Sequence, residues 1–175
     1  MNADRIAFRP ATPTDAPLLA GLARRIWPDA YRGVITDAQI DYMIGWMYAD
    51  ATVARELDAG VLWDILYVSG EPVGYVSYER LDADTVRLHK IYLLPQRQGL
   101  TLGRAMLDRV VQYAAGLGCR RITLTVNKQN ARACAFYFKH GFATIDSIVK
   151  DIGGGFLMDD YLMEKKLTPD NLNAR

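Results

Sequence analysis

Cysteine is scarce in this chain of 175 residues, which contains only Cys119 and Cys134. Two cysteines cannot form the disulfide framework of a small secreted domain, so a reducing, cytoplasmic compartment is the simpler expectation. The chain also lacks a run approaching the roughly 18 apolar residues of a membrane span. Its first residues contain no apolar signal core, so neither a transmembrane helix nor a signal peptide is expected.

An excess of either charge is also missing, since the chain has 21 Lys and Arg residues and 20 Asp and Glu residues. A net charge of +1 gives no support to binding of nucleic acid or of an anionic membrane, so neither partner is expected. Hydrophobic residues make up 50% of the chain, which is enough for one sizeable core. We therefore expect one domain over residues 1–167 and a flexible polar tail over 168–175.

Hydrophobic periodicity and turn residues divide the chain into helices and strands. Pro28 is expected to end the first helix because proline removes a helical N–H donor. Thr36 and Gln39 form a capping-box pattern before the second helix. The expected helices are 16–27, 37–48, 51–58, 102–117 and 130–140, and the expected strands are 5–9, 61–68, 73–81, 86–94, 121–126, 142–150 and 156–166. This order predicts a mixed α/β sheet covered by helices.

One central segment combines three features of an anion site. Strand-forming residues fill 86–94, and Pro95 ends the strand because it cannot donate to a sheet. A turn containing Gly99 and Gly103 leads into the helix over 102–117. A strand, a glycine-bearing turn and a helix N-terminus together favour binding of phosphate. The turn lacks the Gly-Lys-Ser/Thr ending of a P-loop, and an ordinary strand-to-helix turn fits these residues equally well.

Two motifs in this chain resemble those of the GNAT acetyltransferases. Gln98-Gly-Leu-Thr-Leu-Gly103 resembles the coenzyme A pyrophosphate loop of that family, whose pattern is Gln/Arg-x-x-Gly-x-Gly/Ala after a strand that ends near a proline. Thr101 stands where the family prefers the middle glycine. The segment from Leu124 to Phe142 resembles the family's strand, Asn-rich loop, Tyr-bearing helix and closing Gly-Phe.

A weaker resemblance at Tyr31, over 40–48 and over 151–163, is to the PaiA-like polyamine acetyltransferase branch. The GNAT resemblance implies an α/β fold with a central mixed, mostly antiparallel sheet of about seven strands, covered by about four to five helices. It also implies a splayed strand pair at the cofactor site.

The resemblance implies that acetyl-CoA is the acetyl donor. The backbone N–H groups of the loop would hold the pyrophosphate, and the amide near Leu93 would stabilise the oxyanion. From the residues alone, Arg104 and Lys139 fit solvated cations equally well, and Asn130 fits a helix N-cap. The cofactor contacts carried over are Leu93, Leu94, Gln98, Gly99, Leu100, Thr101, Leu102, Gly103, Arg104, Asn127, Asn130, Tyr137 and Lys139.

Acetyl transfer to an amine requires a proton donor for the departing thiolate. The resemblance makes Tyr137 this general acid, and a phenol with a pKa near ~10 can protonate a thiolate whose conjugate acid has a pKa near ~8.5. Without the motif, Tyr137 would be interpreted as a half-buried aromatic residue on a helix. An alkylamine with a pKa near ~10.4 also needs a proton acceptor. His89 and Glu79 are the candidates, although a structural role is the simpler interpretation of His89.

Trp27 and Tyr31 are the candidate acceptor-pocket residues, because they lie in the aromatic-rich segment that covers the acceptor site in this family. Core packing accounts for most of these aromatic residues. We expect an acetyl-CoA-dependent N-acetyltransferase that acts on a primary amine and uses no metal ion. The expected acceptors are small molecules such as polyamines. The alternatives are a protein N-terminal or lysine acetyltransferase and a non-catalytic acyl-CoA-binding sensor. The sequence leaves a monomer and a homodimer equally open.

Overall fold

The computed structural model describes residues 5–99 and 101–168. Leu100 and residues 169–175 of the predicted tail lie outside the described residues. The helices in the described part are α1 (Ala16–Ala30), α2 (Asp37–Met47), α3 (Asp50–Asp58), α4 (Leu102–Gly116) and α5 (Ala131–Lys139). The strands in the same part are β1 (Ile6–Pro10), β2 (Leu62–Val68), β3 (Glu71–Arg80), β4 (Thr85–Leu93), β5 (Arg121–Asn127), β6 (Ala143–Gly153) and β7 (Phe156–Lys166).

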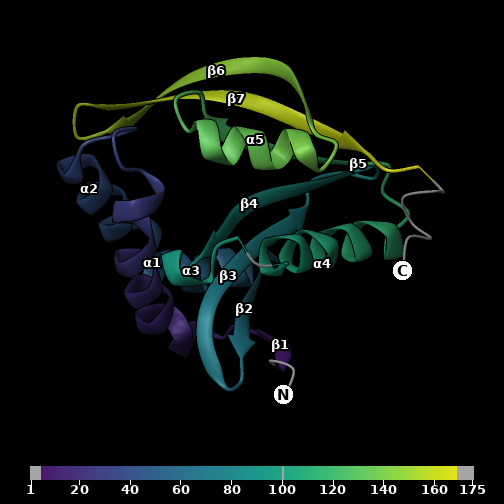
Figure 1. The fold of residues 1–175 in the computed structure, drawn as a ribbon, viewed down its shortest axis with the longest axis horizontal. Coiled ribbons are helices and arrows are strands. Elements are labelled where there is room, and N and C mark those ends of the chain that lie inside the picture. The colour runs from purple at the N-terminus through teal and green to yellow at the C-terminus, as the bar shows by residue number, and fades with distance from the viewer. Residues whose placement is uncertain (1–4, 100, 169–175) are drawn as a thin grey trace. The chain divides into compact units, whose positions relative to one another are not determined.

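The chain folds into two compact units, and β4 and α4 each contribute residues to both (Figure 1). The first unit consists of Met1–Glu79 and Lys90–Asp108, and the second of Arg80–His89 and Arg109–Arg175. The parallel pair β4–β5 stands among antiparallel pairs, namely β1–β2, β2–β3, β5–β7 and β6–β7. The predicted mixed, mostly antiparallel α/β architecture is confirmed. None of the helices in the described residues is both long enough and apolar enough to cross a membrane.

The first unit contains the strands β1, β2, β3 and the end of β4 in that order, together with α1, α2 and α3. The hairpin between β2 and β3 turns at Ser69 and Gly70, whose φ angles of 52° and 88° match a tight hairpin turn. Helix α1 contacts both α2 and α3. The largest fully buried side chains of this unit are Leu19, Leu22, Ile26, Trp27, Trp63, Ile65, Leu66, Tyr75 and Met106.

The prediction that Pro28 ends the first helix was wrong, because α1 continues to Ala30 with Pro28 in its last turn. A proline inside a helix costs ~3 kcal/mol or more, because it removes one hydrogen bond and its ring crowds a carbonyl group. The loss falls at the end of the helix, where only two helical residues follow. The fully buried Trp27 side chain holds this turn against the core, and the Trp27 carbonyl accepts a hydrogen bond from Tyr31 N–H at 2.9 Å.

The second unit contains the start of β4 with β5, β7 and β6 in that order. Figure 1 shows β6 and β7 as a long hairpin with α5 beside it. Lys165 Nζ of β7 donates to the His140 carbonyl at the end of α5 at 2.6 Å. Strand β6 extends to Gly153, beyond the predicted end at residue 150, because the hairpin turn is confined to Gly153–Gly155, where all three φ angles are positive.

The parallel ladder between β4 and β5 is short. In the described residues it joins Thr85–Arg87 to Arg121–Thr123 and ends there. The rest of β5 continues to Asn127 and is paired with β7. The end of β5 therefore has an open edge on the side of β4, as expected of the predicted splayed strand pair.

Candidate functional site

The predicted anion-binding loop lies in the first unit, between the end of β4 and the start of α4. Gly99 has a φ of 79°, a left-handed conformation that glycine adopts without steric cost. The Thr101 carbonyl accepts a hydrogen bond from Ala105 N–H at 3.0 Å, so Thr101 is the residue at which helical bonding begins. Threonine is favoured at such an N-cap position, which gives a physical reason for its presence where the resemblance favours glycine.

The start of α4 fits an anionic group. The N–H groups of Leu102, Gly103 and Arg104 precede the first helical hydrogen bond and have no partner within the helix. They carry the partial positive charge of a helix N-terminus. The Arg104 side chain is 66% exposed and its Nε lies 3.5 Å from Asp108 Oδ2, so it is available at the surface of this helix turn. A helix N-terminus of this kind suits a phosphate group.

Gln98 braces this loop against the end of β4. Its side-chain amide donates to the Leu93 carbonyl at 3.2 Å, and the second hydrogen of the same amide group is left for another acceptor. The Leu94 N–H donates to the Val73 carbonyl of β3 at 2.9 Å. The Leu94 side chain is buried and the Leu93 side chain is half-buried. The polar groups of these two residues are therefore only those of the backbone.

Gly74 on β3 is a residue that the sequence analysis missed. A Cβ atom at this position would overlap the Tyr92 carbonyl oxygen and would lie 3.2 Å from Leu93 Cα. Only glycine lets β3 approach the end of β4 this closely. A glycine inside a predicted strand indicates a bulge or a close backbone approach, and that signal was present in the sequence.

Trp27 and Tyr31, the predicted acceptor-pocket residues, lie together in a buried aromatic cluster of the first unit. Their ring centroids are 5.0 Å apart, and the Tyr31 hydroxyl lies 2.7 Å from the Tyr92 hydroxyl. Tyr48 and Tyr75 form a second hydroxyl pair at 2.5 Å. Burial raises the pKa of both Tyr48 and Tyr75, so this pair stays protonated. Trp27 is fully buried, and Tyr31 is 8% exposed.

The second predicted motif lies in the second unit, where two asparagines shape the turn from β5 into α5. Asn127 Oδ1 accepts from Gln129 N–H at 2.9 Å, and Asn130 Oδ1 accepts from Ala133 N–H at 3.1 Å. The alternative interpretation of Asn130 as the helix N-cap is confirmed. Both side chains thus fix the start of the helix that carries Tyr137.

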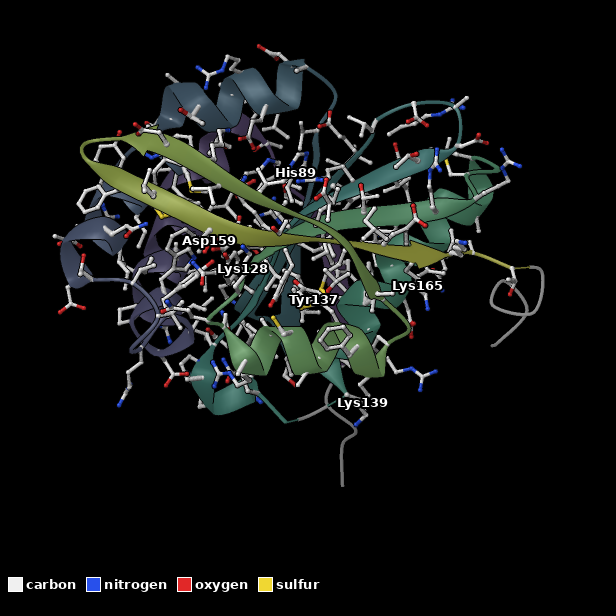
Figure 2. All side chains as sticks on the ribbon, turned by 90° about the horizontal axis from the view of Figure 1, so that it is seen from above. His89, Lys128, Tyr137, Lys139, Asp159 and Lys165 are labelled. Carbon is white, nitrogen blue, oxygen red and sulfur yellow. The ribbon has the colours of Figure 1, made fainter. Side chains whose placement is uncertain are left out.

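Tyr137 is 8% exposed, and its ring packs against Phe136 and Phe142 at centroid distances of 5.4 Å and 5.5 Å. Figure 2 shows Tyr137 and Lys139 on α5, and Lys139 is exposed. Cys134, one turn before Tyr137, is buried, and burial raises the pKa of its thiol. This thiol stays protonated, as expected of a core cysteine rather than a nucleophile.

The two predicted base candidates lie in different units. His89 is exposed on β4 in the second unit, and Glu79 is half-buried near the end of β3 in the first unit. Sequence analysis missed a third candidate, the carboxylate of Asp160 on β7. Desolvation and the charge of Asp159 raise the pKa of Asp160 to about 6, against the opposing charges of Arg87 and Lys128. Its signal was an aspartate pair inside a predicted strand, where aspartate is disfavoured.

Comparison with known proteins agrees with this fold and these motifs. A sequence model of the acetyltransferase (GNAT) family matches residues 22–142. An uncharacterized N-acetyltransferase of Mycobacterium tuberculosis is 33% identical over 160 residues, which cover 88% of this chain and 99% of that protein. The spermidine N(1)-acetyltransferase of Thermoplasma acidophilum is 25% identical over 169 residues, which cover 92% of this chain and 97% of that enzyme.

Among solved structures, the PaiA N-acetyltransferase from Thermoplasma acidophilum in complex with coenzyme A has a similar fold. The TM-score is 0.78 at 23% sequence identity, and the match covers 93% of this chain and 99% of that chain. The seven strands and five helices of the described residues therefore follow a known arrangement.

Proposed function

Because this chain belongs to the GNAT family of acetyltransferases, we propose that it transfers the acetyl group of acetyl-CoA to a small primary amine such as a polyamine. The family match makes the chain an N-acetyltransferase that uses acetyl-CoA. The observation that supports the acceptor class is the relative that acetylates spermidine, which matches over 92% of this chain.

The donor is held by the loop that follows β4. The N–H groups at the start of α4 and the exposed Arg104 supply positive charge for the pyrophosphate, while Gln98 keeps the loop against Leu93. When bound, acetyl-CoA supplies an activated acetyl group as a thioester.

Tyr137 acts as the general acid that protonates the departing thiolate. Its hydroxyl is carried on a helix whose start is fixed by Asn127 and Asn130, and its ring is held by two phenylalanines. A preorganised phenol of this kind loses little entropy when it donates its proton. General acid catalysis of this type contributes about 10²–10⁴-fold to the rate.

The acceptor amine must lose a proton before it can attack. His89 and Glu79 are the two proton acceptors that the sequence analysis proposed for this step. Removing either side chain by substitution with glutamine tests its role, because glutamine keeps hydrogen-bonding capacity but cannot titrate near neutral pH. We place the reaction in the cytoplasm, since the two cysteines are free.

The test is to measure release of free thiol from acetyl-CoA with a panel of amines. The panel contains spermidine, spermine, amino acids, an aminoglycoside and peptides with free N-termini or lysines. The proposal predicts that kcat/KM is highest for the polyamines. Preference for a peptide would instead identify a protein acetyltransferase, and binding of acetyl-CoA without turnover on any amine would identify a sensor.

A further inference from the structure

Asp160 occupies an unusual place for a carboxylate, because it lies in the interior of a three-stranded ladder. It pairs with Asn127 of β5 on one side and with Ile148 of β6 on the other. Aspartate is depleted in strands and is rarely buried without a partner. Such a residue weakens the fold unless another element compensates, so its presence indicates a role beyond packing.

One oxygen of this carboxylate has no hydrogen-bond donor in the described residues. Asp160 Oδ1 is buried there without a hydrogen-bond partner. Lys128 directly follows β5, and its Nζ lies 2.5 Å from Asp159 Oδ1 and over the Tyr161 ring. Figure 2 shows Lys128 and Asp159 side by side. Arg87 of β4 donates to Thr125 Oγ1 at 3.3 Å. A buried carboxylate oxygen is thus left ready to accept a proton or a hydrogen bond.

Asp160 and α5 lie on opposite faces of the sheet in the second unit. Lys165, five residues further along β7, points to the face covered by α5, where it reaches the His140 carbonyl. Side chains alternate between faces along a strand, so Asp160 shares the other face with its ladder partner Asn127. The helix that carries Tyr137 therefore lies on one face, and Asp160 lies on the other.

This arrangement is compatible with acetyl transfer, because the nitrogen that loses a proton and the sulfur that gains one are two different substituents of the tetrahedral carbon, so separate groups can serve them. The open edge of β5 beyond Thr123 is one strand spacing, about 4.8 Å, from β7. A carboxylate on β7 is therefore close to that edge, on the face opposite the helix of the proposed acid. The charged groups that act on Asp160 are Asp159 on its own strand, Arg87 on β4 and Lys128 after β5.

On β6, Asp146 and Lys150 share the face of Asp160, since they flank its ladder partner Ile148 by two residues on either side. His89 lies on the same face of β4 as Arg87, which is in register with Thr123. Asp146, Lys150 and His89 are exposed, whereas Asp160 is half-buried. Glu164, four residues further along β7, is also half-buried on this face, where it pairs with Thr123. Asp160 is distinguished by its buried Oδ1, which lacks a hydrogen-bond partner.

We infer that Asp160 is the catalytic base of the acetyl transfer and takes a proton directly from the acceptor ammonium. This inference rests on the proposed function. The neutral amine then forms the C–N bond, the C–S bond breaks, and the sulfur takes a proton from Tyr137. The remaining extra proton on nitrogen restores Tyr137, and Asp160 releases its proton to solvent, so the overall reaction frees one proton.

The environment of Asp160 favours this step. An ordinary aspartate with a pKa near ~3.9 is a weak acceptor for a proton from an amine with a pKa near ~10.4. The raised pKa of about 6 narrows this gap by about two units, while leaving the carboxylate ionised at neutral pH. Because the pKa of Asp160 is raised, we expect kcat/KM to fall as the pH drops through about 6, since protonated Asp160 cannot accept a proton.

The test compares Asp160→Asn with the matched variant Asp159→Asn, using thiol release on the best amine between pH 5 and 9. D160N is expected to lower kcat by about 10²-fold or more and to remove the acidic limb of the profile. D159N keeps the base and removes a charge that raises its pKa, so its limb shifts to lower pH. Binding of acetyl-CoA, measured by calorimetry, is expected to be unchanged in both variants.

A D160N enzyme with the wild-type rate and the wild-type acidic limb of the pH profile would overturn this inference. So would a loss of that limb in His89→Gln or Glu79→Gln alone. A wild-type enzyme that turns over no amine would instead overturn the proposed function. Should D160N fail to fold, two other measurements test the role of Asp160. They are the pH at which the acidic limb of the D159N profile lies and an NMR titration of the Asp160 carboxyl in the wild-type protein. A carboxyl that titrates near an ordinary aspartate value would contradict the assignment.

Discussion

The side-chain amide of Gln98 donates to the backbone carbonyl of Leu93 at 3.2 Å, joining the loop before α4 to the last residue of β4. This bond closes a turn that contains Pro95 and ends just before Gly99, so this part of the loop has a fixed shape before any ligand binds. Preorganisation of this kind lowers the entropy lost on binding. Under the proposed function, Gln98 is thus a positioning residue for the amides at the start of α4.

Replacing Gln98 with leucine is expected to raise KM for acetyl-CoA with little change in kcat. The substitution removes one hydrogen bond, worth about 1 kcal/mol, which corresponds to a change of about fivefold. Steady-state kinetics with varied acetyl-CoA measures this effect. Gln112→Leu is the matched control, because Gln112 is exposed on α4. An unchanged KM in Q98L would show that the loop keeps its shape without this bond.

Replacing Gly74 with alanine is expected to destabilise the protein by about 2–4 kcal/mol, since the added methyl group overlaps the backbone of β4 and neither strand can move freely. Urea denaturation measures the change in unfolding free energy. Gly45→Ala, in the middle of α2, is the control, because a Cβ there meets no atom within 4 Å. Alanine at this helical position is expected to stabilise by about 0.5–1 kcal/mol. Equal effects of the two substitutions would contradict the close approach of β3 and β4.

The buried ion pair between Lys90 and Glu56 gives a prediction with a defined pH dependence. Lys90 Nζ lies 3.3 Å from Glu56 Oε2, which also accepts from Trp63 Nε1 at 3.1 Å. Burial lowers the pKa of Lys90, and Glu56 opposes this shift. Glu56→Gln leaves a buried charge unpaired and is expected to cost about 3 kcal/mol at neutral pH.

The cost of E56Q should shrink as the pH rises. At a pH above the lowered pKa of Lys90, the folded chain binds fewer protons at this residue than the unfolded chain does. The free energy of unfolding therefore increases with pH in that range. Urea denaturation at pH 7 and 9.5 measures the trend. The exposed pair of Arg32 and Asp29, tested as Arg32→Gln, is expected to have little effect. A cost for E56Q that is independent of pH would mean that Lys90 does not carry the charge.

The sequence predicted those features that depend on neighbours along the chain. The helix–loop–strand order, the Thr36 cap and the Asn130 N-cap follow from local residue types and were found at the expected positions. The prediction at Pro28 was wrong because the free-energy cost of a proline depends on its distance from the helix end, and packing determines where that end lies. That α1 continues past its proline could be explained only after the structure showed that Trp27 is fully buried.

Relationships between strands could not be predicted in this way, because periodicity gives the face of a residue but not its register. The approach of Gly74 to Tyr92 and the pairing of Asp160 with Asn127 each join distant parts of the sequence. His89 and Glu79 were selected because their residue types titrate, whereas the desolvation of Asp160 requires the surrounding sheet. The candidate base was therefore found only from the structure.

The most direct test of the central claim is the rate of thiol release from acetyl-CoA with the best amine, in the wild type, Tyr137→Phe and Tyr113→Phe. Tyr113 is a half-buried tyrosine of α4 and serves as the control for loss of a hydroxyl group. Acetyl transfer with Tyr137 as general acid predicts a loss in kcat of about 10²-fold or more in Y137F and nearly full activity in Y113F. A Y137F enzyme that turns over at the wild-type rate would contradict it.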